Sequence, residues 1–129
     1  MAIHGLNHVN IRTRRPLLDA LRDFYRDVLG LQEGFRPPFA GFGYWLYADD
    51  KAVIHLYEAE PEEIRPTDVA NTLDHFAFDC TGRTEVEATL NRHGTAYRKT
   101  TVPLTNQVQL FLHDPAGNHV ELNFATPEA

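Results

Sequence analysis

The chain has 129 residues, of which 43% are hydrophobic and 23% charged, a composition ordinary for one globular domain or for two half-size units sharing a core. Its formal net charge of −6 gives no electrostatic reason to bind nucleic acid or an anionic membrane, and we expect neither as a partner. The single cysteine, Cys80, excludes an intramolecular disulfide. An N-terminus unlike a signal peptide and the lack of a long apolar stretch predict a cytoplasmic protein.

The first half of the chain predicts one strand, one helix and three further strands. Residues 5–12 alternate between apolar and polar side chains, which is typical of a strand. Apolar residues then recur at helical spacing over 17–29, between Pro16, which suits a helix start, and Gly30, which suits a helix end. Three short strands are expected near 31–36, 42–47 and 52–58.

The second half repeats the first. Residues 73–78 (LDHFAF) match residues 6–11 (LNHVNI), and residues 112–122 (LHDPAGNHVEL) match residues 46–56 (LYADDKAVIHL) without a gap. The repeat predicts a strand at 73–80, a helix near 84–93, and strands near 96–101, 107–113 and 118–124.

These elements define one domain over residues 1–129 that is built from two modules. The first module runs from about 5 to 58 and the second from about 73 to 124, and the prolines and acidic residues of 59–72 predict a solvated linker. One βαβββ module cannot bury both sides of its sheet. We therefore expect an α+β fold in which two tandem βαβββ modules form a curved mixed eight-stranded sheet, with helices outside and a concave cleft for a ligand.

Four residues stand at matched positions of the repeat. The duplication places His8 over His75 and His55 over Glu121. The spacing within each module is nearly the same, with 47 residues from His8 to His55 and 46 from His75 to Glu121. If the modules pair about a pseudo-twofold axis, equivalent residues meet near that axis. Three imidazoles and a carboxylate are ligands for zinc, nickel, iron or manganese. The pattern predicts one divalent metal ion bound by His8, His55, His75 and Glu121.

Each of these residues has a simpler interpretation when it is considered alone. A lone histidine in a strand is more often structural or exposed than a ligand, and Glu121 alone would most often be a solvated residue. The matched positions favour ligands. The other histidines lack such partners: we expect His4, His93 and His119 at the surface and His113 in the cleft.

The sequence resembles the vicinal oxygen chelate superfamily, also called the glyoxalase, bleomycin resistance protein and dioxygenase superfamily. The resemblance covers nearly the whole chain, and it rests on LNH at 6–8, FYRDVLGL at 24–31, DH at 74–75 and DPAGNHVE at 114–121. In this family an aspartate-proline-x-glycine turn leads into the strand with the metal-binding glutamate. The resemblance implies paired βαβββ units and metal ligands at the positions of His8, His55, His75 and Glu121.

Within the family, glyoxalase I is the first candidate. The resemblance implies a lyase or isomerase whose ion stabilises an enediolate of a small oxygen-chelating substrate as a Lewis acid, with Glu121 as the base. It also implies a homodimer. Glyoxalase I usually has glutamate where this chain has His55, so the site carries one carboxylate where that enzyme has two.

Several other activities stay open. In an extradiol ring-cleaving dioxygenase, His8, His75 and Glu121 would hold iron and His55 would be an acid–base residue, although Phe111 replaces the tyrosine of that family. A thiol transferase acting on fosfomycin is another possibility. A non-catalytic drug-binding resistance protein is a different class, whose members generally lack the four ligands. The aromatic segment 35–45 would line the substrate pocket or, alternatively, pack in the core or an interface.

Overall fold

The computed structural model describes residues 2–65 and 72–125. The chain divides into two compact units, Met1–Thr67 and Asp68–Ala129. The predicted linker, about 59–72, includes residues 66–71, which lie outside the described residues.

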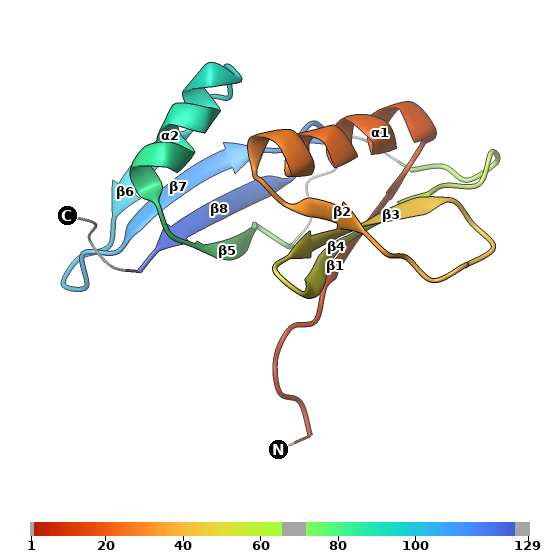
Figure 1. The fold of residues 1–129 in the computed structure, drawn as a ribbon, viewed down its shortest axis with the longest axis horizontal. Helices are drawn as coiled ribbons and strands as arrows, with labels where there is room; N and C mark the ends of the chain where they lie inside the picture. The colour runs from red at the N-terminus through yellow and green to blue at the C-terminus, as the bar shows by residue number, and fades with distance from the viewer. Residues whose placement is uncertain (1, 66–71, 126–129) are drawn as a thin grey trace. The chain divides into compact units, whose positions relative to one another are not determined.

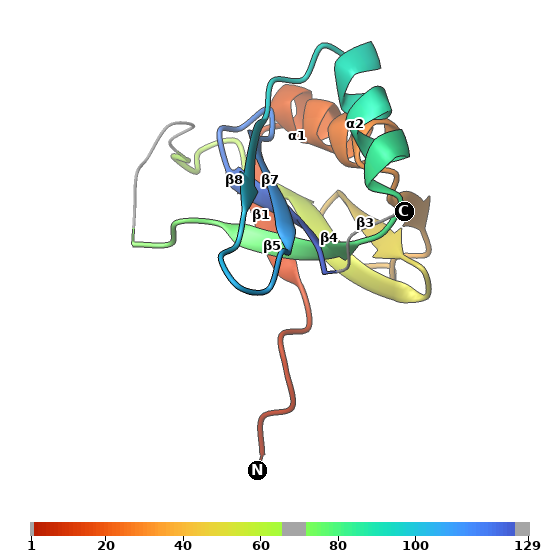
Figure 2. The same cartoon turned by 90° about the vertical axis from the view of Figure 1, so that its left-hand side faces the viewer.

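The first unit contains a four-stranded sheet and one helix (Figure 1). The strands lie in the order β1-β4-β3-β2, with β1 parallel to β4 and the other neighbours antiparallel. Residues 2–8 precede β1 as an extended segment that leads away from the strands of this unit (Figure 2). The elements are β1 (Val9–Thr13), α1 (Arg15–Asp23), the π-helix η1 (Phe24–Val28), β2 (Gln32–Gly34), β3 (Gly43–Ala48) and β4 (Lys51–Glu58).

Helix α1 packs on its own sheet because one of its faces is apolar. Leu18 and Leu21 on α1 and Tyr25 on η1 are fully buried, and α1 contacts β1, β3 and β4. The helical segment ends before Gly30, whose φ of +81° is a left-handed conformation that favours glycine. The buried apolar strand residues of this unit are Leu46, Ile54 and Leu56.

The second unit has the same topology. Its strands lie in the order β5-β8-β7-β6, again with one parallel pair, β5 and β8, and antiparallel neighbours elsewhere. Its elements are β5 (Phe76–Cys80), α2 (Arg83–Arg92), β6 (Arg98–Thr101), β7 (Val108–His113) and β8 (His119–Phe124). The core residues of this unit are Leu90, Leu110, Leu112, Val120, Leu122 and Phe124.

The α+β class and the tandem βαβββ units are confirmed, and three details differ from the sequence analysis. The eight strands are distributed over two four-stranded sheets, one in each unit. Strands β1 and β5 begin at Val9 and Phe76, so His8 and His75 lie one residue before their strands and not within them. The first helix continues into a π-helical turn, which a simple helical spacing does not predict. Among the described residues, no helix is both long and apolar enough to cross a membrane.

Candidate metal site

The first unit brings His8 and His55 together. Their imidazole rings stack with centroids 3.7 Å apart and an interplanar angle of 13°. Strand β4 carries His55 directly opposite Asn10 of β1, and His8 lies two residues before Asn10, so both histidines are on one face of the sheet. A positive charge on His8 would disfavour a second positive charge on His55, so this neighbour favours the neutral, metal-binding form of His55.

The ring of His55 is held on both faces and at one edge. Trp45, opposite His55 on β3, stacks on its other face with centroids 4.0 Å apart, and Nε2 lies 3.2 Å from the carbonyl oxygen of Ala52. A neutral ring that donates through Nε2 keeps the lone pair of Nδ1 for another partner. Burial lowers the pKa of His55, and the nearby His8 and Arg36 lower it further. The ring of His55 is therefore fixed in orientation, and its surroundings favour the neutral form.

The second unit brings His75 and Glu121 together. The Nε2 atom of His75 lies 3.1 Å from Oε1 of Glu121, whose side chain is 7% exposed. The Nδ1 atom of His75 donates to Oδ2 of Asp74 at 2.7 Å. The hydrogen bond to Asp74 raises the pKa of His75, and the charge of Glu121 raises it further. A metal ion that binds Nε2 would therefore displace a proton from this imidazole.

A tight turn and one amide position Glu121. Asp114 accepts hydrogen bonds through Oδ1 from the backbone N–H groups of Ala116 and Asn118, each at 2.9 Å, and Gly117 has a φ of +85°. This turn leads from β7 into β8, which carries Glu121 opposite Phe111. The side-chain amide of Asn123 donates to Oε2 of Glu121 at 3.0 Å.

His8 and His75 each form a hydrogen bond with the residue directly before them in the chain, a contact that the sequence pattern was not used to predict. The Nδ1 atom of His8 lies 2.7 Å from Oδ1 of Asn7, the same arrangement as His75 with Asp74. An oxygen that accepts the Nδ1 proton fixes the ring and leaves Nε2 for a metal ion. The signal was present in the sequence, because Asn7 and Asp74 occupy equivalent positions of the repeat.

The donor set suits a divalent metal ion, since each unit offers two side chains of the imidazole and carboxylate types that bind zinc and other first-row transition metals. The structure brings the four predicted residues together as two pairs, one in each unit. Within residues 2–65 and 72–125, no group of three or more His, Cys, Asp and Glu side chains is gathered closely enough to hold an ion.

The remaining histidines divide differently from the prediction. His4 and His93 are exposed, as expected. His119, which was expected at the surface, is half-buried and stacks on His113 across β7 and β8, with centroids 4.1 Å apart. This pair lies two positions along the register from Phe111 and Glu121, and therefore on the same face of the sheet.

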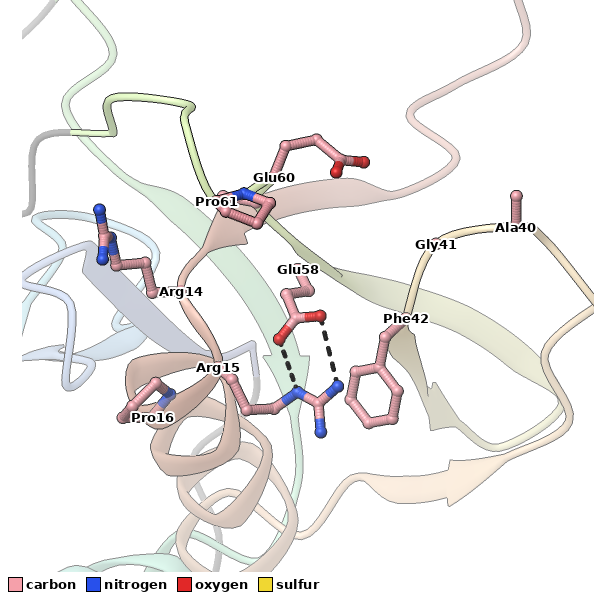
Figure 3. Close-up of a pocket in the computed structure, with 10 residues that line it drawn as sticks. Arg14, Arg15, Pro16, Ala40, Gly41, Phe42, Glu58, Glu60 and Pro61 are labelled. Atoms are coloured by element: carbon pink, nitrogen blue, oxygen red, sulfur yellow. Dashed lines mark hydrogen bonds and ion pairs between the residues drawn. The ribbon is translucent and has the colours of Figure 1, made fainter.

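A pocket of about 560 Å³ lies in the first unit at the N-terminal end of α1 (Figure 3). Arg15 donates to both carboxylate oxygens of Glu58, at 2.9 and 3.3 Å, and its guanidinium carbon lies 3.3 Å from the centroid of the Phe42 ring. The residues lining it include none of the four predicted ligands. Because Glu58 neutralises Arg15 there, the pocket shows no concentration of charge that points to a ligand.

Comparisons with known proteins agree with this fold. The model of the Glyoxalase/Bleomycin resistance protein/Dioxygenase superfamily matches residues 5–122. No curated protein matches the sequence.

Several solved structures are similar over nearly the whole chain. A glyoxalase/dioxygenase from Nostoc punctiforme has a TM-score of 0.76 at 20% identity and covers 98% of this chain and 94% of its own. A lactoylglutathione lyase from Agrobacterium tumefaciens has a TM-score of 0.67 at 21% identity, with 96% of each chain covered. The fosfomycin resistance protein FosX from Listeria monocytogenes has a TM-score of 0.67 at 16% identity, with 96% of this chain and 95% of its own covered. At these identities the likeness concerns the fold.

Proposed function

Because the chain belongs to the glyoxalase/bleomycin resistance protein/dioxygenase superfamily, we propose that it is a metal-dependent lyase or isomerase of the glyoxalase type. The proposal assigns one divalent ion (zinc, nickel, iron or manganese) to His8, His55, His75 and Glu121. Members of this superfamily typically bind a divalent metal ion, and many of them are enzymes. The observation that carries the proposal is that each unit pairs its two predicted ligands, at equivalent positions of the repeat.

The residues have separate roles in this proposal. A bound ion would supply Lewis-acid chemistry to two neighbouring oxygens of the substrate. Glu121 moves the proton between adjacent carbons, and the amide of Asn123 sets the orientation of its carboxylate. His55 is a ligand, because a ring stacked on both faces and bonded at Nε2 is held in one orientation.

The fixed position of His55 also bears on the principal alternative function, an extradiol-type dioxygenase. In an extradiol-type dioxygenase, His8, His75 and Glu121 would hold iron while His55 exchanged protons with the substrate. Such an acid–base group works best with its exchanging nitrogen exposed to the reacting atoms, and His55 is only 9% exposed. The fixed imidazole therefore favours the lyase over the dioxygenase.

The decisive experiment measures activity after the metal has been removed with a chelator and replaced. We expect protein loaded with Ni²⁺ or Zn²⁺ to convert the glutathione–methylglyoxal adduct to a thioester, and Glu121→Gln to abolish this turnover while His93→Ala retains it. Oxygen uptake on catechols by Fe²⁺-loaded protein, without lyase activity, would replace the lyase by the dioxygenase. Thiol addition to fosfomycin, or stoichiometric drug binding without any turnover, would replace it by a transferase or a binding protein.

The proposal includes a homodimer in the cytoplasm. Analytical ultracentrifugation tests the first part, and a mass of about twice 14.7 kDa is expected. Cell fractionation tests the second, with the protein expected in the cytoplasmic fraction.

A further inference from the structure

One arginine of the first unit, Arg36, has no acidic partner among the described residues and lies on the sheet face that carries His55. Arg36 donates through Nη1 to the carbonyl oxygen of Gly41 at 3.0 Å, and within the described part of the chain no carboxylate forms an ion pair with it. Its Nε atom is buried without a hydrogen-bond partner, and no other described side-chain nitrogen or oxygen is in that condition. A buried donor left unpaired is unfavourable, so this guanidinium is suited to an acceptor from outside the chain.

Arg36 lies near Tyr57 of β4 and Gly43 of β3. Its guanidinium carbon lies 5.8 Å from the centroid of the Tyr57 ring, and Tyr57 is two residues beyond His55 on the same strand. The absence of a side chain at Gly43, opposite Tyr57, makes room for it, since a Cβ there would lie 3.1 Å from both Nε and Cζ of Arg36. Arg36 therefore lies on the face of the sheet that carries His55.

Aromatic rings surround this guanidinium. Its carbon lies 5.1 Å from the centroid of the Phe39 ring, which lies 6.1 Å from Trp45, which in turn stacks on His55. Phe39 is 52% exposed and belongs to a loop between β2 and β3, so the aromatic segment is not packed in the core. A cation bordered by partly exposed aromatic rings suits an anion that carries an apolar or aromatic group.

The neighbouring arginine on this face is already neutralised. Arg12 also lies over the Tyr57 ring, at 4.4 Å from its centroid, and donates to both carboxylate oxygens of Glu63 at 2.6 to 3.0 Å. Of these two arginines, Arg36 is therefore the one that has no carboxylate partner among the described residues and can bind a new anion.

We propose that Arg36 binds a carboxylate of the substrate, and that the substrate carries an apolar or aromatic group near this carboxylate while its chelating oxygens face the metal ligands. The inference rests on the proposed function, because it names the substrate class of that same site. With Nη1 bonded to Gly41, the free edge of the guanidinium is Nε with Nη2, the edge that binds a carboxylate through two parallel hydrogen bonds. Since Nε is out of contact with solvent, binding of a carboxylate at this edge requires a movement of the Arg36 side chain or of the atoms that cover it.

The test uses metal-free protein, so that it does not depend on metal chemistry. Phenylacetate and its neutral counterpart phenylacetamide are titrated into ¹⁵N-labelled protein after chelator treatment, and binding is followed by the amide and arginine Nε–H resonances. We expect phenylacetate to bind at least tenfold more tightly than phenylacetamide, because hydrogen bonds to a charged group have about that effect. Inorganic phosphate is the second anion, and it is expected to bind more weakly than phenylacetate because it lacks the apolar group.

Two variants and a control make the assignment specific. Arg36→Gln should remove the preference for phenylacetate, and Arg36→Lys should restore only part of it, since lysine keeps the charge without the two-pronged geometry. Arg98→Gln is the matched control, because Arg98 also lies over an aromatic ring, Phe111 at 4.8 Å, but in the second unit. It should keep the full preference.

The outcomes that overturn the inference are equal affinity for the acid and the amide, an unchanged preference in Arg36→Gln, or tighter binding of phosphate than of phenylacetate. His75→Ala is included to separate the two proposals. It should lose metal binding and retain phenylacetate binding, so a failure of the metal site leaves the result for Arg36 unaffected.

Discussion

The hydrogen bond between Asp74 and His75 offers a perturbation that leaves every proposed metal ligand in place. Asp74→Ala removes the carboxylate that accepts the Nδ1 proton at 2.7 Å. The imidazole then loses both the group that fixes its orientation and the charge that makes Nε2 a stronger ligand. Loss of such an outer partner typically costs 10- to 100-fold in metal affinity. The side chain of Asp74 is 82% exposed, so solvent screens its charge and we expect the lower end, about tenfold.

The assay uses the only tryptophan of the chain as a reporter. Trp45 stacks on His55 at 4.0 Å, so Ni²⁺ bound at this imidazole should quench its fluorescence. Titration against a chelator of known affinity then gives the dissociation constant for the wild type and for Asp74→Ala. Asp79→Ala is the matched control, since it removes an exposed carboxylate from β5, the strand that follows His75, and the only carboxylates that form an ion pair with His75 within the described residues are Asp74 and Glu121. An unchanged constant in Asp74→Ala, or an equal loss in Asp79→Ala, would refute the reasoning.

Three further results are expected. In metal-free protein, NMR titration should give His75 a pKa above about 6.5 and His55 a pKa below it. Protonated His75 then stabilises the fold at low pH, and this effect is lost as the pH rises through its raised pKa, whereas the contribution of His55 is lost as the pH falls through its lowered pKa. The reverse order of the two pKa values would contradict the hydrogen bond assigned to His75 and the burial of His55. Burial raises the pKa of Cys80 to about 11, so a disulfide reagent at pH 8 should react slowly with the thiol of the folded protein and rapidly with the protein unfolded in urea. Fast reaction of the folded protein would indicate an activated thiol and contradict this expectation. Leu110→Ala should lower the free energy of unfolding, measured in urea, by about 2–5 kcal/mol because Leu110 is fully buried. Leu104→Ala should have almost no effect because Leu104 is fully exposed, and similar values for the two variants would contradict the assignment of Leu110 to the core.

The repeat made the topology predictable. Matching LNHVNI with LDHFAF and the two last strands with each other fixes the order of elements in both units, and the structure has that order. Strand ends were less predictable, because alternation of side chains continues into extended segments that lack a hydrogen-bonded neighbour. This is why residues 5–8 and 73–75 seemed to belong to strands that begin at Val9 and Phe76.

The four residues of the candidate site could be predicted from their equivalent positions in the repeat. The side chains that surround them could not be predicted in the same way. The pairs His8 with His55 and His75 with Glu121 follow from register, since one strand pair in each unit carries or adjoins both members. The stacking of Trp45 on His55 depends on how β3 pairs with β4, a register that the sequence does not specify residue by residue. Arg36 lies in a loop without periodicity, so only the three-dimensional structure shows that its Nε is buried and unpaired.

The measurement that most directly tests the central claim is the metal content of protein dialysed against limiting Ni²⁺ and then freed of loosely bound ions. The four-ligand site predicts one ion per chain in the wild type and in His93→Ala, and a sharp loss in both His8→Ala and His75→Ala, because each variant removes a ligand from a different unit. Two ions per chain, or full occupancy in His75→Ala with the fold intact, would contradict a single site shared by His8, His55, His75 and Glu121.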